Sequence, residues 1–517
     1  MNVTHIALSG LLAATLTTAA TGEVHPDRRT ATPLALAPST FPSAGAVSDR
    51  FLSYNIEMVE LTGGRFWKPY DSPVAATGKA DLHEYRPPID LTNRRLRMLA
   101  AALGPAYVRY SGTWANATYF PDTETSPRVA PAGYDTVLTR QQWRNAVQFA
   151  KHVDAEIVTS VATSPGARTP EGRWQSDNAQ RLFRYTVSIG GRIAASEFAN
   201  EPNLIGGTKP PAIYTSADYR RDYKIFYDWI RAESPATRIL APGAIELGAA
   251  HPLPASFKVF PKEELLERGS QRPDAVSFHY YGGTSKRCSG LDEADALTDT
   301  WLSSIDKAIT DTGTLRDSLA PGAPVWLTET ADAACGGSPW AKTFVDSFRF
   351  ADQLARAARQ GVQVYMHNTL AASDYGLLDD HSFAPRPNYW VAYLWRQTMG
   401  ARVLDAGKGQ PEAGLRVYAQ CQRNVSGGVT VLAINTDRQH GKTLDVANKG
   451  ELFSLTQAGS DASHIVLNGA ALELGANDSL PRLHGRSVNR RVSLPAGSVN
   501  FITLPAANNA ACRAPKA

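Results

Sequence analysis

The 517-residue chain has few cysteines, little net charge and no long apolar run beyond its first residues. Its formal net charge is +4, from 53 Lys and Arg against 49 Asp and Glu, which is too small to indicate nucleic-acid binding. No later segment reaches 18 apolar residues, so no membrane association is expected once a leader is removed. Hydrophobic residues make up 43% and charged residues 20%, which excludes disordered, collagen-like and coiled-coil chains.

The one apolar run lies at the N-terminus, from Ile6 to Ala20, and small residues follow it up to Gly22. This pattern predicts a secretory signal peptide over residues 1–22, with a retained signal anchor as the alternative. A run of about 15 residues is too short to span a bilayer. We therefore expect a secreted or periplasmic protein.

The four cysteines are Cys288, Cys335, Cys421 and Cys512. An even number in an exported chain fits two disulfides, for which three pairings exist, and buried free thiols are the alternative. No two cysteines are close enough in sequence to form a zinc knuckle, so we expect no structural metal.

Short β-branched segments alternate with amphipathic helical patterns between residues 51 and 399. Eight such repeats predict a (β/α)8 TIM barrel, and a doubly wound sheet is the alternative. The first strand, FLSYNIE, is not followed by the glycine-rich phosphate loop typical of doubly wound sheets. The predicted strands are 51–57, 106–112, 156–163, 194–200, 238–244, 275–281, 324–330 and 362–370.

Residues 400–517 show short alternating strands separated by Gly, Asn and Asp turns. This pattern predicts a C-terminal β-sandwich behind the α/β barrel. Residues 23–50 are either a loose leader or an edge strand of that sandwich.

Two glutamates stand where predicted barrel strands end, which is where barrel enzymes place catalytic residues. Glu201 follows the fourth strand and Glu329 ends the seventh. A single such Glu is often a helix cap or an ion-pair partner. Two of them facing one another across a barrel mouth supply the acid and the nucleophile or base of glycoside hydrolysis. Asn200, next to Glu201, is suited to bind a sugar 2-hydroxyl.

The motifs around these glutamates, EFANEPN and VWLTETADAACGG, resemble the two catalytic motifs of glycoside hydrolase family 79, the family of heparanases and β-glucuronidases. FLSYNIE, PAYVRYSGT, VSFHYY, SDYGLLDD and RVYAQC also have counterparts in the same order, between residues 51 and 513. The resemblance implies a cofactor-free enzyme with catalytic glutamates on strands four and seven of a (β/α)8 barrel.

The resemblance assigns Glu201 as acid/base and Glu329 as nucleophile. It places the hydroxyl of Tyr281 and the guanidinium of Arg109 beside Glu329, where both favour the ionised carboxylate. Asn200 matches the asparagine that stands before the acid/base in the wider clan. Glu201 must be protonated in the first step, so a raised pKa is expected for it.

The resemblance also implies a site for the carboxylate of glucuronic acid. The backbone N–H groups of Cys335 and Gly336 and the hydroxyl of Tyr375 are expected to bind it, because glycine lets the backbone approach an anion. Thr113 is assigned to substrate binding as well. Glu57 stands where heparanases have Asp, and its role in holding the sugar is left open.

The similarity of RVYAQC and the final AAC to the family implies a disulfide between Cys421 and Cys512. Cys288 and Cys335 are then left for one another, beside the nucleophile.

Three features near the site keep alternatives open. His279 either borders the site or is structural, and Lys286 and Arg287 are either anion contacts or a solvated loop. The segment between Glu57 and Leu96 is longer than in heparanases, so one rim of the cleft is rebuilt.

The predicted function is that of a secreted retaining β-glucuronidase that acts by double displacement on a glucuronic-acid-containing glycan or glycoside. Endo action on heparan-sulfate-type chains is favoured, with exo action on terminal glucuronides as the alternative. A non-catalytic carbohydrate-binding protein is the hypothesis from another class. No nucleic-acid partner is expected, and the protein is expected to be a monomer.

Overall fold

The computed structural model describes residues 33–72, 82–125, 127–204, 214–248, 259–269, 271–288, 292–407 and 409–513. The predicted signal peptide, residues 1–22, lies outside the described residues. Within them, no helix has the length and apolar character needed to cross a membrane.

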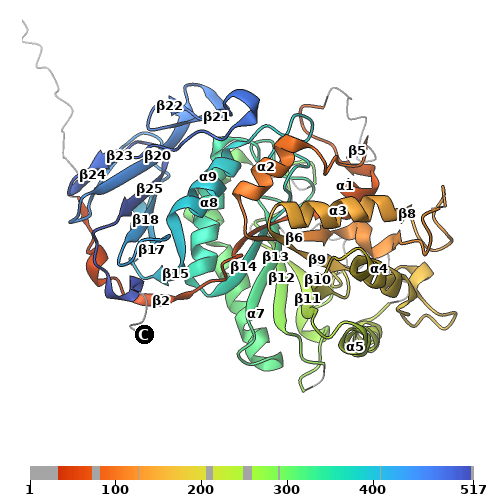
Figure 1. Cartoon of the computed structure of the whole chain (residues 1–517). Coiled ribbons are helices and arrows are strands. Elements are labelled where there is room, and N and C mark those ends of the chain that lie inside the picture. The colour runs from red at the N-terminus through yellow and green to blue at the C-terminus, as the bar shows by residue number, and fades with distance from the viewer. Residues whose placement is uncertain are drawn as a thin grey trace, which may run out of the picture. The chain divides into compact units, whose positions relative to one another are not determined.

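Eight parallel strands close into a barrel in chain order, which confirms the predicted TIM barrel (Figure 1). Each predicted strand is present, with ends that differ by a few residues. Their side chains are buried almost throughout, because the barrel interior and the surrounding helices cover both faces. The strands are β3 (Leu52–Glu57), β6 (Ala106–Ser111), β9 (Ala155–Ser160), β10 (Ile193–Glu197), β11 (Arg238–Leu247), β12 (Ala275–Tyr281), β13 (Val325–Ala331) and β14 (Val362–His367).

Amphipathic helices follow the strands, and most of them bury one face against the barrel, whereas the last two are buried almost all round. In α3, Trp143, Val147 and Ala150 are buried at helical spacing, and Thr139 and Gln142 form a capping box at its start. The helices are α1 (Met58–Thr62), α2 (Arg94–Ala102), α3 (Arg140–His152), α4 (Asp177–Ser188), α5 (Ser216–Glu233), α6 (Asp299–Ser303), α7 (Ile305–Leu319), α8 (Phe344–Arg359) and α9 (Pro387–Thr398).

Two further sheets form the predicted β-sandwich. The smaller sheet has the order β1-β19-β24, and the larger has β2-β15-β17-β18-β25-β20-β21-β22, with β16 beside β17 and β23 beside β20. The strands are β1 (Leu34–Ala35), β2 (Ser43–Ala46), β15 (Met399–Leu404), β16 (Gly409–Gln410), β17 (Leu415–Gln422), β18 (Val429–Asn435), β19 (Lys442–Asp445), β20 (Gly450–Ala458), β21 (Asp461–Leu467), β22 (Ala470–Ala471), β23 (Arg486–Val488), β24 (Arg491–Leu494) and β25 (Ser498–Leu504).

Strands β17, β18 and β25 at the centre of the larger sheet are buried on both faces, because alternate residues serve two cores. Val431 and Ala433 of β18 pack in the core shared with the smaller sheet. Leu432 and Ile434 pack on the other side, in the core that includes helices α8 and α9. The two helices therefore join the sandwich to the barrel through one continuous apolar core.

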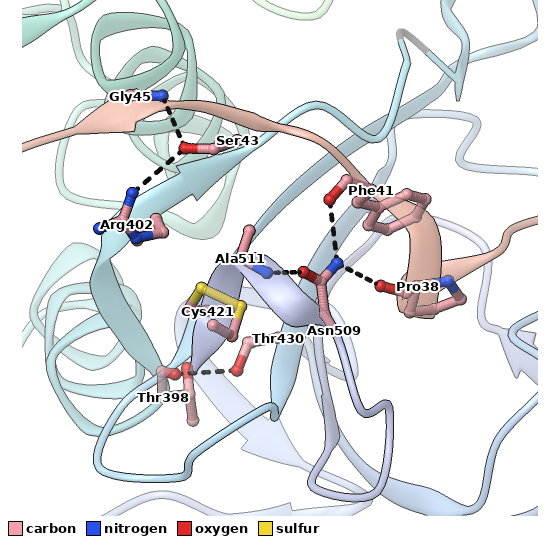
Figure 2. The surroundings of a disulfide bond; sticks show 11 residues. Pro38, Phe41, Ser43, Gly45, Thr398, Arg402, Cys421, Thr430, Asn509 and Ala511 are labelled. Carbon is pink, nitrogen blue, oxygen red and sulfur yellow. Dashed lines mark hydrogen bonds between the residues drawn. A yellow bond between two sulfur atoms is a disulfide. The ribbon is translucent and has the colours of Figure 1, made fainter. Parts of the chain in front are cut away.

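The segment before the barrel belongs to the sandwich. Strand β1 pairs in parallel with β19, and β2 pairs antiparallel with β15. The side-chain amide of Asn509 donates hydrogen bonds to the carbonyls of Pro38 and Phe41, at 2.7 and 2.9 Å (Figure 2). Residues 34–46 thus form edge strands, while residues 23–32 lie outside the described part of the chain.

Both expected disulfides form. Cys421 and Cys512 are bonded beside this N-terminal segment, with their Cα atoms 5.3 Å apart (Figure 2). Cys288 and Cys335 are bonded with their Cα atoms 6.5 Å apart, and they connect the loops that follow β12 and β13.

Candidate active site

The carboxyl ends of the barrel strands surround a cavity of about 670 Å³. Such a volume is typical of a small-molecule site and exceeds that of a single monosaccharide. Seven of the residues expected in the site line this cavity: Glu57, Thr113, Glu201, Tyr281, Glu329, Cys335 and Tyr375.

Glu329 lies at the base of the cavity and is held by two donors. The hydroxyl of Tyr281 donates to Oε1 at 2.7 Å, and Nη1 of Arg109 donates to Oε2 at 2.8 Å. Charge-assisted bonds of this kind stabilise an ionised carboxylate and fix its orientation. The structure therefore brings together Glu329, Tyr281 and Arg109 as expected.

Arg109 is itself held by a carboxylate that the sequence reasoning missed. Its Nε donates to Oε2 of Glu197 at 2.9 Å, and Oε1 of Glu197 accepts from the hydroxyl of Thr328 at 2.8 Å. Nη2 of Arg109 donates to Oδ1 of Asn200 at 2.8 Å, so the amide nitrogen of Asn200 remains a donor. The sequence did contain a signal for this contact, since Glu197 lies in the apolar strand AASE. A carboxylate that is buried in such a strand needs a cationic partner.

His279 belongs to the site. Its Nε2 lies 3.2 Å from Nη2 of Arg109, and its Nδ1 lies 3.2 Å from Oε1 of Glu201. A guanidinium only donates, so Nε2 accepts, and the ring proton is assigned to Nδ1, which donates to Glu201. Burial and the charge of Arg109 hold the pKa of His279 well below its usual value, so the ring stays neutral.

Glu201 is a carboxyl group with a raised pKa, as expected for an acid catalyst. Burial is the main cause, and the nearby charge of Glu329 adds to it. Its backbone has a left-handed φ of 48°, a conformation that costs free energy in a residue other than glycine and that recurs at functional sites. A carboxyl group with a raised pKa is suited to act as a general acid.

Glu201, His279 and Glu329 each bring one ligand-type atom within 4.8 Å of the others. Nδ1 of His279 is the nitrogen that lies near both carboxyl groups, and it carries the ring proton in the assigned tautomer. Glu329 already has a cationic partner in Arg109. A donor set that is satisfied in this way fits proton transfer better than the binding of a cation.

Glu57 is a second buried carboxyl group in the cavity wall. It caps α1 through a reciprocal pair of bonds with Glu60, and burial raises its pKa well above the usual value, with Glu329 contributing. Its Oε2 has no hydrogen-bond partner among the described residues. A Cβ on Gly112 would lie 1.4 Å from that oxygen, so only glycine fits there.

The expected carboxylate-binding turn contributes Cys335 to the cavity wall. Cys335 and Gly336 both have left-handed backbones, with φ of 66° and 78°. Cys335 lines the cavity, whereas Gly336 lies behind it, where a Cβ would be 2.4 Å from the Cβ of Trp67. The hydroxyl of Tyr375 accepts a long bond, 3.5 Å, from Asn368, which leaves its own hydrogen available. Asn368 and Trp67 were not singled out from the sequence.

Arg287 departs from both expectations for its loop. It is not solvated and does not line the cavity, because its side chain is 9% exposed and pairs with Asp374 at 3.0 Å. Lys286 is exposed, as expected for a solvated loop.

Comparison with known proteins places the chain in a family. The model described as "Glycosyl hydrolase family 79, N-terminal domain" matches residues 132–355. Heparanase-like protein 1 of Arabidopsis thaliana is 30% identical over 66% of this chain and 68% of its own length. Heparanase of Mus musculus is 28% identical over 90% of this chain and 92% of its own length.

A solved structure supports the fold. The 4-O-alpha-L-rhamnosyl-beta-D-glucuronidase of Fusarium oxysporum superimposes with a TM-score of 0.65 at 15% identity, covering 91% of this chain and 100% of that one. The chain therefore belongs to glycosyl hydrolase family 79 and is a glycoside hydrolase similar to heparanases.

Proposed function

We propose that the protein is a retaining β-glucuronidase that uses Glu329 as nucleophile and Glu201 as acid/base. The observation that carries this proposal is geometric: one carboxylate oxygen of Glu201, a group whose pKa burial raises, lies within 4.8 Å of an oxygen of the hydrogen-bonded Glu329. Retaining enzymes hold their two carboxyl groups about 5–5.5 Å apart, and inverting enzymes about 6.5–9.5 Å. The short separation supports double displacement.

In the first step, a carboxylate oxygen of Glu329 attacks the anomeric carbon while Glu201 gives its proton to the departing glycosidic oxygen. The C1–O bond breaks and an ester between C1 and Glu329 forms. Esterification removes the negative charge that helps to raise the pKa of Glu201. Glu201, now ionised, takes a proton from water as the water attacks C1, and the free carboxylate of Glu329 is regenerated.

The remaining groups hold the sugar. The amide nitrogen of Asn200 is assigned to the 2-hydroxyl, since its Oδ1 already binds Arg109, and Glu57 lines the same cavity. The uronic carboxylate is assigned to the N–H groups of Cys335 and Gly336 and to the hydroxyl of Tyr375. Such charge-assisted bonds contribute about 1.5–3 kcal/mol each.

The carboxylate assignment is tested with Tyr375→Phe. We expect kcat/KM on an aryl β-glucuronide to fall by about tenfold or more, because a charge-assisted hydrogen bond is lost. Activity on the matching aryl β-glucoside, which lacks the carboxylate, should stay low and little changed. If the wild-type protein hydrolysed both substrates equally well, the substrate class would be wrong.

We further propose exo action on terminal glucuronic acid, in place of the endo action that overall similarity favours. A hairpin of β4 (Gly64–Trp67) and β5 (His83–Arg86) forms one wall of the cavity, with the rings of Trp67 and His83 4.3 Å apart. Trp67 also packs against Gly336 of the carboxylate turn. In a pyranose, C4 lies opposite C1 and next to C5, which bears the carboxylate. A wall next to this turn would therefore block the position from which a longer sugar chain continues through C4.

Product sizes distinguish the two modes. With a heparan sulfate or glucuronide-capped oligosaccharide as substrate, we expect free glucuronate and a remainder shortened by one sugar. Oligosaccharides of intermediate length would instead establish endo action.

Export from the cytoplasm is part of the proposal, and it is supported by the two disulfides, which persist in oxidising compartments.

A further inference from the structure

A buried carboxylate contacts the chain where β4 ends. We call residues 67–70, from the last residue of β4 onward, the rim segment. Asp374 has a fully buried side chain, and it accepts a bond from the backbone N–H of Tyr70 at 3.2 Å. It also pairs with Arg287 at 3.0 Å and lies 3.6 Å from the ammonium of Lys342. One carboxylate thus connects the rim segment to loops that follow β12 and β13.

Arg287 makes two side-chain contacts with the same rim segment and one with Asp374. Its guanidinium lies 3.9 Å from the centre of the Tyr70 ring, which is a cation–π distance. Its Nη1 donates to the carbonyl of Lys68, and its Nη2 donates to Asp374. Lysine could not make these contacts together, because they use the planar, forked guanidinium.

The two sequence neighbours of Asp374 act on the proposed carboxylate site. The hydroxyl of Ser373 donates to the carbonyl of Gly336 at 2.8 Å, and Tyr375 presents its hydroxyl to the cavity. On the other side, Arg287 precedes Cys288, which is bonded to Cys335 of the same turn. A shift of Asp374 or Arg287 would therefore move the groups assigned to the uronic carboxylate, although neither residue lines the cavity.

We propose that Asp374 and Arg287 are positioning residues that hold the rim segment against the Cys335–Gly336 turn and so set the affinity for the glucuronate. The inference rests on the proposed function, since it assigns a role toward that same carboxylate. A buried ion pair adds little net stability, because desolvation offsets most of the attraction. Its value here is the fixed geometry of four chain segments that meet at one carboxylate.

Asp374→Asn tests the inference. The amide keeps an acceptor for the N–H of Tyr70 but leaves Arg287 buried without its counter-charge. We expect KM for an aryl β-glucuronide to rise by about tenfold with kcat changed less than about threefold, because substrate positioning is lost while Glu201 and Glu329 keep their places. Asp71→Asn is the matched control. It removes another acidic partner of Lys342, but the side chain of Asp71 is 72% exposed. Kinetics like those of the wild type are therefore expected.

A double variant separates positioning from mere folding. Combining Asp374→Asn with Arg287→Met removes both charges, and its rise in KM should be smaller than the product of the two single effects, because the residues act as a pair. If thermal melting shows that Asp374→Asn does not fold, Arg287→Lys decides, with the same expected rise in KM. If the wild-type enzyme hydrolyses glucuronides and the variants have an unchanged KM, the inference is overturned but the proposed function is not. A wild-type enzyme inactive on glucuronides would overturn the proposed function itself.

Discussion

Glu329→Ala is expected to lower kcat on an aryl β-glucuronide by about 10⁴-fold or more, the largest effect of any single change in the site. Neither Glu57 nor Glu201 can replace it, since Glu57 is engaged in capping α1 and Glu201 is needed as the acid. The truncated side chain leaves a space beneath the anomeric carbon, next to Arg109 and Tyr281. Steady-state kinetics with a dinitrophenyl glucuronide measures the loss.

Azide distinguishes a lost nucleophile from a damaged fold. A small anion that enters the vacated space attacks C1 from the face that Glu329 used, so the product should be the α-glucuronosyl azide, with activity partly restored. Melting temperatures of the variant and wild type provide the folding control. A β-configured azide from this variant would show that Glu329 is not the nucleophile.

The second large effect is expected from Glu201→Ala. On a phenyl glucuronide, kcat/KM should fall by about 10²–10⁴-fold, because the leaving oxygen departs without a proton. On a dinitrophenyl glucuronide, whose leaving group is a weak base, the same parameter should fall far less. Here azide should give the β-configured product, since it attacks the glycosyl enzyme in place of activated water. Equal losses on both substrates would contradict the assignment of Glu201 as the acid.

The pH profile supplies an independent check on the same residue. Burial and the charge of Glu329 raise the pKa of Glu201, so its reactive protonated form persists above the usual range of a carboxyl group and is lost as pH rises through the raised pKa. The kcat/KM of the wild type should therefore fall on the alkaline side. In Glu201→Ala this alkaline decrease should disappear, because the group that titrates is gone.

The fold could be predicted because the barrel repeats one local pattern. VQVYMH and AVSFHYY are apolar, β-branched or aromatic segments between amphipathic helices, and each became a barrel strand. The pairing partners of residues 34–46 could not be predicted in the same way. Their contacts join strands that are more than 350 residues apart in the chain, and no local pattern encodes such a pairing.

For the site, the residues around the barrel mouth could be predicted, but not the contacts between them. Glu201, Tyr281 and Glu329 come at or shortly after strand ends, which the barrel topology brings together. Glu197, Asn368 and Trp67 contribute through packing across strands or through a rebuilt hairpin, which depends on side-chain geometry that a sequence pattern does not carry. The solvated or anion-binding expectation for Arg287 was wrong because its partner, Asp374, lies 87 residues away.

The pairing of β1 with β19 and of β2 with β15 affects the order in which the molecule can be completed. Residues 34–46 are synthesised early, yet their partners at 399–404 and 442–445 emerge hundreds of residues later. At about 5–20 residues per second, the first segment waits on the order of a minute or less for its neighbours. Until the strands from the C-terminal region arrive, the apolar side chains of Leu36 and Phe41 have no core to occupy. Closing the sandwich, and bonding Cys421 to Cys512 beside it, is therefore a late event that joins the first and last parts of the described chain.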